Sequence, residues 1–240
     1  MLMLIVCLVS FSAAAETDDS IATEVSGLSE IIGGSNTLDI ILSMSLIMLI
    51  PSILIMTTCF TRIIIVLSIL RNALGLQQTP PNQVLIGIAL FLSLFIMAPV
   101  IGDINTQAYE PYKNGEISQG EVLEKAVVPL REFMMKQTKN EDLNFFLEIS
   151  GSERPETYDE ISTFVIIPAF ITSELRRAFL IGFLMYLPFL IIDMVVASTL
   201  MSMGMVMLPP TIISLPFKLM LFVLVDGWKL LFQTLVSSFN

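Results

Sequence analysis

The sequence predicts an all-helical, membrane-associated protein built from helical hairpins with a helical insert between them. The composition is the first reason: 55% of the 240 residues are hydrophobic and only 14% are charged, against roughly 25% charged residues in soluble domains. Long uncharged runs and an uneven distribution of charge are the other two reasons. Histidine is absent, which argues against Ser-His and Cys-His nucleophilic catalysis and the usual zinc sites.

The net charge of −10 is concentrated in two regions. Residues 16–39 carry six acids and no base, residues 103–160 carry thirteen acids and six bases, and the remainder carries three acids and six bases. Lys and Arg collect on the cytoplasmic side of membrane proteins, so we expect both acidic regions on the outer side. The acidic balance also argues against nucleic-acid binding.

The first 37 residues predict a leader and a tether. Residues 1–11 are almost wholly apolar, and the small residues before Glu16 predict a signal peptide, residues 1–15, cleaved after Ala15. No Lys or Arg precedes the apolar run, so an uncleaved anchor is the alternative. Residues 16–37 are polar and predict a periplasmic tether. Cleavage would remove Cys7 and leave Cys59 alone, which permits no intrachain disulfide.

Residues 38–102 predict the first helical hairpin. Residues 40–60 and 84–102 are uncharged and match the roughly 20 apolar residues that a helix needs to span a membrane. Pro51 predicts a kink in the first span, and Pro80-Pro81 predicts a sharp break between the two. Arg62 and Arg71 place the turn between the spans in the cytoplasm.

Residues 103–160 predict a soluble helical insert. Ser118 and Glu121 have the spacing of a capping box at a helix start. Apolar residues then recur at helical spacing, a second helix is predicted at 141–148, and Pro129 is expected to bend the first. Because the apolar stripe is narrow, the insert would be marginal as a free domain. We expect it to pack on a partner or on copies of itself.

Residues 161–240 predict a C-terminal helical region whose apolar runs are interrupted by charges. A charge facing lipid costs about 2.5–3.5 kcal/mol on the insertion scale. We therefore expect these charges to pair with neighbours, line a wet passage or lie partly outside the bilayer. The uncharged run 161–173 spans only about 20 Å as a helix, short of a hydrocarbon core of about 30 Å. The charged candidates are Glu174, Arg176, Arg177, Asp193 and Lys218.

Asp193 has two readings from the sequence. An acid within a membrane segment is a candidate ion or proton site, whereas pairing with Arg176, Arg177 or Lys218 is the reading we favour. Glu174 with the two arginines forms either a solvated helix end or a buried intersubunit salt bridge, and the sequence does not choose. An intramembrane aspartyl protease using Asp103 and Asp193 lacks the usual flanking motifs.

A methionine-rich turn is the sharpest local feature of the sequence. Met201, Met203, Met205 and Met207 alternate with other residues, and Pro209-Pro210 ends the element. Methionine is flexible and apolar, so these side chains suit packing against core or lipid. Repeated around a ring, they would form an apolar constriction. A thioether copper site is a third reading, although such sites usually include His or Cys.

The C-terminal region contains two distinctive long blocks, PAFITSELRRAFLIGF at 168–183 and PFLIIDMVVASTLMSMG at 188–204. These blocks resemble the FliP family of the type III export gate (the FliP/SctR family), and residues 60–83 resemble the family's first hairpin. The likeness runs from about residue 38 to the end. The signal-like leader and the sizeable acidic insert resemble flagellar members more than the shorter virulence-injectisome counterpart, which remains the alternative within the family.

The resemblance implies an all-helical subunit of the flagellar export gate in the bacterial inner membrane, within the flagellar basal body. It implies a ring of five copies completed by FliR, surrounded by FliQ and joined by proteins such as FlhB and FlhA. This ring conducts unfolded flagellar subunits, with helical hairpins lifted largely out of the bilayer plane. The resemblance implies no enzymatic role and no cofactor, and the sequence has no phosphate-binding loop pattern to power transport.

The resemblance also places an apolar seal, the pore gasket, on Met205, Val206 and Met207, with Met201 and Met203 as further pore-loop residues. The middle position is Val here, where Met is common in the family. An alternative of another class is a stand-alone secondary transporter that uses Asp193 as its proton site. A large mixed ring would favour the gate, and a monomer or dimer the transporter.

Overall fold

The computed structural model describes residues 55–151, 160–205 and 207–239, with six further residues between 44 and 53. The chain divides into two units, Met1–Ile55 and Met56–Asn240, and the account below concerns the second. The predicted signal peptide 1–15, the predicted tether 16–37 and part of the first predicted span 40–60 lie outside the described residues.

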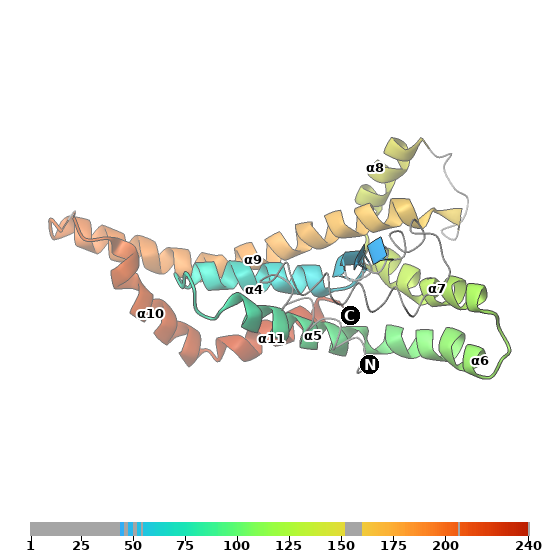
Figure 1. Cartoon of the computed structure of the whole chain (residues 1–240). Helices are drawn as coiled ribbons and strands as arrows, with labels where there is room; N and C mark the ends of the chain where they lie inside the picture. Colours follow the sequence, from blue (N-terminus) through green and yellow to red (C-terminus); the bar gives the residue numbers. More distant parts are fainter. Residues whose placement is uncertain are drawn as a thin grey trace. The chain divides into compact units, whose positions relative to one another are not determined.

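Over the described residues the second unit is helical and contains no strand, in agreement with the predicted all-α class (Figure 1). Its elements in chain order are α4 (Phe60–Ala73), α5 (Asn82–Ile104), the π-helical η1 (Asn105–Tyr109), α6 (Glu110–Lys113), α7 (Gln119–Gln137), α8 (Asn140–Ser150), α9 (Thr163–Ser202), α10 (Pro210–Leu224) and α11 (Gly227–Ser237).

The second predicted span extends further than the sequence suggested. α5, η1 and α6 form one helix of 32 residues from Asn82 to Lys113, so helix continues past the expected boundary at residue 102. It starts directly after Pro81 and stops at Asn114-Gly115, where Gly115 has φ of +77°. Pro99 and Pro111 lie within this helix without ending it, whereas the left-handed glycine ends it.

α7 begins as predicted, and it places the insert on the rest of its own chain. Ser118 opens it with a capping box, in which the Ser118 N–H donates to the Glu121 carboxylate at 2.7 Å. This hydrogen bond holds the pKa of Glu121 below its ordinary value. Pro129 lies inside α7, which continues as one helix to Gln137.

The apolar stripes of α7 and α8 pack on the first half of α9. The cluster contains Met134, Leu143, Leu147, Ile161, Val165, Ile166, Ala169 and Phe170. Residues Gln119–Ser150 thus find apolar cover within the chain, whereas the sequence suggested that they pack on a partner or on copies. The long separation between α7 and α9 in the sequence hid this contact.

α9 differs most from the sequence expectation, because charges do not interrupt it. It runs for 40 residues without a break through Glu174, both arginines and Asp193. Arg and Glu are themselves good helix formers, and the charged side chains of α9 find partners that offset the cost of burying them. The predicted break after residue 202 is present: Gly204 has φ of +75°, and Met205 N–H donates to Leu200 O, completing a Schellman cap.

α4 packs along α9, α5 contacts α4, and α10 turns back against α9 (Figure 1). The approach of α4 to α9 is close at Gly182, where an added Cβ would lie 2.5 Å from Ile69 Cδ1. Within the part of the chain that the structure describes, two helices, Asn82–Lys113 and Thr163–Ser202, are long and apolar enough to cross a membrane. α10 and α11, which meet at 64°, pass the same test only as a pair.

Candidate functional site: buried charge clusters and the methionine turn

Arg62 on α4 and Glu174 on α9 form a fully buried ion pair. Both side chains have no exposed surface. Arg62 Nε donates to Glu174 Oε2 at 2.8 Å, and Arg62 Nη2 donates to Glu174 Oε1, so the contact is bidentate. Planar guanidinium and carboxylate groups match in this geometry, which fixes the two helices relative to one another.

Further polar groups complete this cluster. Arg62 Nη1 donates at 2.9 Å to both the carbonyl and the hydroxyl oxygen of Ser238, and Arg62 Nη2 donates to Gln137 Oε1 at 3.2 Å. Gln137 Oε1 also accepts from Arg177 at 2.6 Å, while its amide donates to Phe239 O at 3.0 Å. The Phe239 ring lies 3.6 Å from the guanidinium carbon.

We name this group, defined by Arg62, Gln137, Glu174, Arg177, Ser238 and Phe239, the junction cluster. It joins α4, α7, α9 and the residues after α11 at one buried point. Because a buried charge is stable only when its hydrogen-bonding groups are satisfied, the cluster acts as a unit. Glu174 and Arg177 were among the predicted charge-pair residues, whereas Arg62 was not predicted to be their partner. The sequence does narrow the choice of partner for Arg62, because only three acids lie outside the two acidic regions.

A second pair lies toward the other end of α9. Lys218 on α10 donates to Asp193 Oδ2 at 2.6 Å and to the carbonyl of Ala73, the last residue of α4, at 3.1 Å. Ser214 Oγ donates to the other Asp193 oxygen at 2.6 Å. A cation at a helix C-terminus is favourable. Asp193 is therefore held by two donors from α10 within one chain.

Arg176 belongs to a third, more exposed group between α8 and α9. It donates to Asp142 at 2.8 Å and to Glu141 at 3.1 Å, and Asp142 also accepts from Ser173 at 2.6 Å. The exposed fractions of the Arg176 and Glu141 side chains are 47% and 81%. Both acids lie in the first turn of α8, where negative charge is favourable.

The methionine turn, defined as residues 201–208, has little cover from the rest of the chain. The exposed fractions are 65% for Met201, 72% for Met203, 48% for Met205 and 97% for Met207. Val206, the middle residue of the predicted gasket, lies outside the described residues. The turn thus presents several thioethers on a surface that its own chain does not fill.

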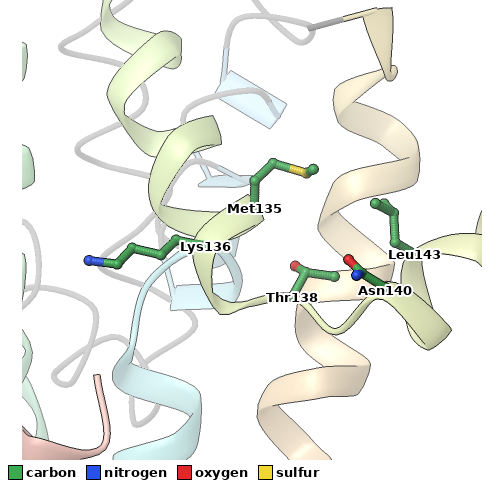
Figure 2. Close-up of a pocket in the computed structure, with 5 residues that line it drawn as sticks. All are labelled: Met135, Lys136, Thr138, Asn140 and Leu143. Carbon is green, nitrogen blue, oxygen red and sulfur yellow. The ribbon is translucent and has the colours of Figure 1, made fainter. Parts of the chain in front are cut away.

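The structure also has a small pocket of about 220 Å³ between the end of α7 and the start of α8. It is lined by Met135, Lys136, Thr138, Asn140 and Leu143 (Figure 2). In Figure 2 the amine of Lys136 points away from the other four side chains. The lining holds one charged group and no acid, and among the described residues no group of three His, Cys, Asp or Glu could hold a metal.

Comparison with known proteins decides the family. A sequence model of the FliP family matches residues 43–235, which is more than half of the chain. The chain belongs to the FliP family. Flagellar biosynthetic protein FliP of Bacillus subtilis is 53% identical over 205 residues, covering 85% of this chain and 93% of its own length.

Two further FliP proteins are similar over most of the chain. Flagellar biosynthetic protein FliP of Pectobacterium carotovorum is 53% identical, covering 79% of this chain and 73% of its own length. The FliP protein of Aquifex aeolicus is 48% identical, covering 87% and 90%. The family resemblance that the blocks at 168–183 and 188–204 carried is thereby confirmed. The junction cluster, the Asp193 pair and the methionine turn all include residues of the matched region.

Proposed function

We propose that this chain is a core subunit of the flagellar type III protein export gate and forms part of the pore for unfolded flagellar subunits. The observation that carries this proposal is its high identity to several proteins named Flagellar biosynthetic protein FliP. The role is passive conduction without enzymatic chemistry, so another component supplies the driving force.

The exposed apolar surface of the described helices supports assembly with other subunits. Phe95 on α5 is 75% exposed, Phe183 on α9 is 60% exposed and Val223 on α10 is 74% exposed. Large apolar side chains exposed in such number are typical of surfaces that meet lipid or another protein. In our proposal lipid and neighbouring subunits cover these faces, in a ring of five copies with FliR and FliQ, next to FlhB and FlhA.

The proposed placement is in the bacterial inner membrane within the flagellar basal body. We assign residues 1–15 to a signal peptide, 16–37 to a periplasmic tether and 38–102 to the first hairpin. Residues 103–160 form the periplasmic insert, and 161–240 the C-terminal region with the pore loop. The acidic charge of the insert and the bases around it support this orientation.

The proposed gasket is Met205, Val206 and Met207, with Met201 and Met203 beside it. Apolar side chains around a narrow passage exclude water when the passage is empty, and flexible thioethers yield when a chain passes. The high exposure of Met207 in the single chain supports this role, because the side chain is free to face a passage between copies.

Deletion of residues 205–207 tests the gasket. The variant, produced together with its export-apparatus partners, is expected to make the membrane several-fold more permeable to small ions than the wild type. Membrane conductance measured in cells is the readout. A matched control removes three residues from the exposed turn 114–116, which lies far from the gasket in the sequence and should leave conductance unchanged.

Equal conductance in wild type and deletion variant would contradict the gasket. Native mass measurement of the extracted complex tests the assembly independently. A large mixed ring supports the gate, whereas a lone monomer with a saturable small substrate supports a secondary transporter. The contacts of Asp193 with Lys218 and Ser214 favour a structural role for this acid over a proton site.

A further inference from the structure

The methionine turn combines high exposure with a chemically reactive side chain. Met201 lies in the last turn of α9, and Met203, Met205 and Met207 lie between its Schellman cap and the helix that starts at Pro210. An added Cβ on Gly204 would meet no atom within 4 Å. The described part of the chain therefore leaves these thioethers largely uncovered.

Methionines elsewhere in the chain provide a comparison for the exposure of the methionine turn. Met97 on α5 is 4% exposed and Met134 on α7 is 1% exposed, so packing shields both. Met194 on α9 and Met220 on α10 are 62% and 58% exposed, but they lie among apolar residues of candidate membrane segments. Lipid or a neighbouring subunit covers such faces, whereas a turn at the passage borders the water on either side of the proposed seal.

We propose that the methionine turn is a site of reversible methionine oxidation, and that its oxidation by hydrogen peroxide loosens the closed gate. Each thioether sulfur takes one oxygen atom from hydrogen peroxide to become a sulfoxide, and the peroxide leaves as water. A dithiol reductant reverses the step through a sulfoxide reductase: the dithiol becomes a disulfide, and the oxygen leaves as water. The effect on the gate rests on the proposed function.

The physical consequence is a change in wetting. A thioether is apolar, and a ring of thioethers repels water from a narrow passage. A sulfoxide is polar and accepts hydrogen bonds, so water molecules fill the same space at lower cost. Several sulfurs lie within each turn, and every copy in the proposed ring contributes the same set. Partial oxidation would therefore convert an apolar seal that excludes water into a hydrated passage.

Peptide mapping tests the site itself. Membranes that hold the chain with its export-apparatus partners are treated with hydrogen peroxide, and peptides are analysed for the mass of one added oxygen atom. We expect Met207 and Met203 to oxidise several-fold faster than Met97 and Met134, with Met194 and Met220 also protected. Oxidation of Met207 no faster than that of buried Met134 would overturn the proposed site.

Conductance tests the consequence. Peroxide is expected to raise the ion leak of the wild type several-fold, and the reductase with a dithiol to restore it. A variant with Leu at positions 201, 203, 205 and 207 keeps the apolar surface but lacks sulfur, so its leak should not respond. The control variant, with Leu at 194 and 220, should respond like the wild type. Native mass measurement confirms assembly, and Met207→Leu alone serves if the fourfold variant does not assemble.

Two failures can be told apart. Deletion of residues 205–207 opens the proposed seal without peroxide. If this deletion leaks while peroxide oxidises the turn without any leak, the oxidation switch is wrong and the gate stands. If the deletion does not leak either, the proposed gasket itself is wrong.

Discussion

The two halves of α9 differ in what covers them, although both are strongly apolar. Eight of the ten buried residues of this helix lie before residue 183. In that half, Glu174 meets Arg62, Arg177 meets Gln137 and Arg176 meets Asp142. The later half has one ion pair, between Asp193 and Lys218, and exposes side chains such as Ile191 and Met194.

This difference shows that apolar content alone does not reveal which part of a helix packs against its own chain and which part faces lipid or another subunit. The first half is covered by α4, α7 and α8 of the same chain. The second half packs only in part against α10 and leaves an apolar face for lipid or neighbouring subunits. Substitutions in the first half are therefore expected to affect the stability of the single chain. Substitutions in the second half should affect the assembly and its permeability.

The largest effect is expected from Glu174→Gln in the junction cluster. The substitution leaves the Arg62 charge buried without its carboxylate, which costs about 3–5 kcal/mol. Thermal unfolding of the purified chain in mild detergent measures the loss. The double variant Arg62→Met with Glu174→Gln is expected to recover much of it, because the unpaired charge is gone. Equal stability of the single and double variants would contradict this account.

A smaller effect is expected from Gly182→Ala, at the contact between α4 and α9. The added methyl would lie 2.5 Å from Ile69 Cδ1, and overpacking of this kind costs about 1–3 kcal/mol. Ile69→Val removes the closest atom and should relieve part of the loss in the double variant. Gly87→Ala is the matched control, because its added Cβ meets nothing within 4 Å. A loss of similar size at Gly87 would refute the packing explanation.

Glu141→Gln is expected to change stability little, in contrast to the same substitution at Glu174. The Glu141 side chain is 81% exposed and its partner Arg176 is 47% exposed, and exposed ion pairs contribute about 0–1 kcal/mol. Added salt should reduce the difference between variant and wild type further. A loss approaching that of Glu174→Gln would mean that burial does not separate the two pairs. The same unfolding measurement provides the comparison.

The smallest effect is expected at the start of α7 and depends on pH. The pKa of Glu121 is lowered from 4.5 by the hydrogen bond from Ser118 N–H. Its stabilising contribution is therefore present above pH 4.5 and is lost as the pH falls through the lowered pKa. Amide hydrogen exchange at Ser118 should accelerate at acid pH relative to the variant Glu121→Gln, after correction for intrinsic rates. An identical pH profile in both proteins would contradict the capping box.

Much of the architecture could be predicted from local patterns in the sequence. The capping box at Ser118, the break after Pro80-Pro81 and the end of α9 near Gly204 depend on neighbouring residues only. Helix starts and ends follow from proline, which lacks a backbone N–H donor, and from glycine, which adopts the left-handed conformation; both residues can be read from the sequence. The two blocks around Glu174 and Asp193 were long enough to identify the family.

The partners of the buried charges depended on the folded chain. Arg62 and Glu174 lie 112 residues apart, and Asp193 and Lys218 lie on different helices. From the sequence, the charged residues interrupt the C-terminal apolar runs, because no local pattern identifies the distant residue with which each charge pairs. Folding brings those partners within hydrogen-bond distance, which offsets much of the cost of burying charges along the 40 residues of α9. Local residue types in the sequence thus determine where helices begin and end. Packing between distant segments in the tertiary structure determines which charges are paired.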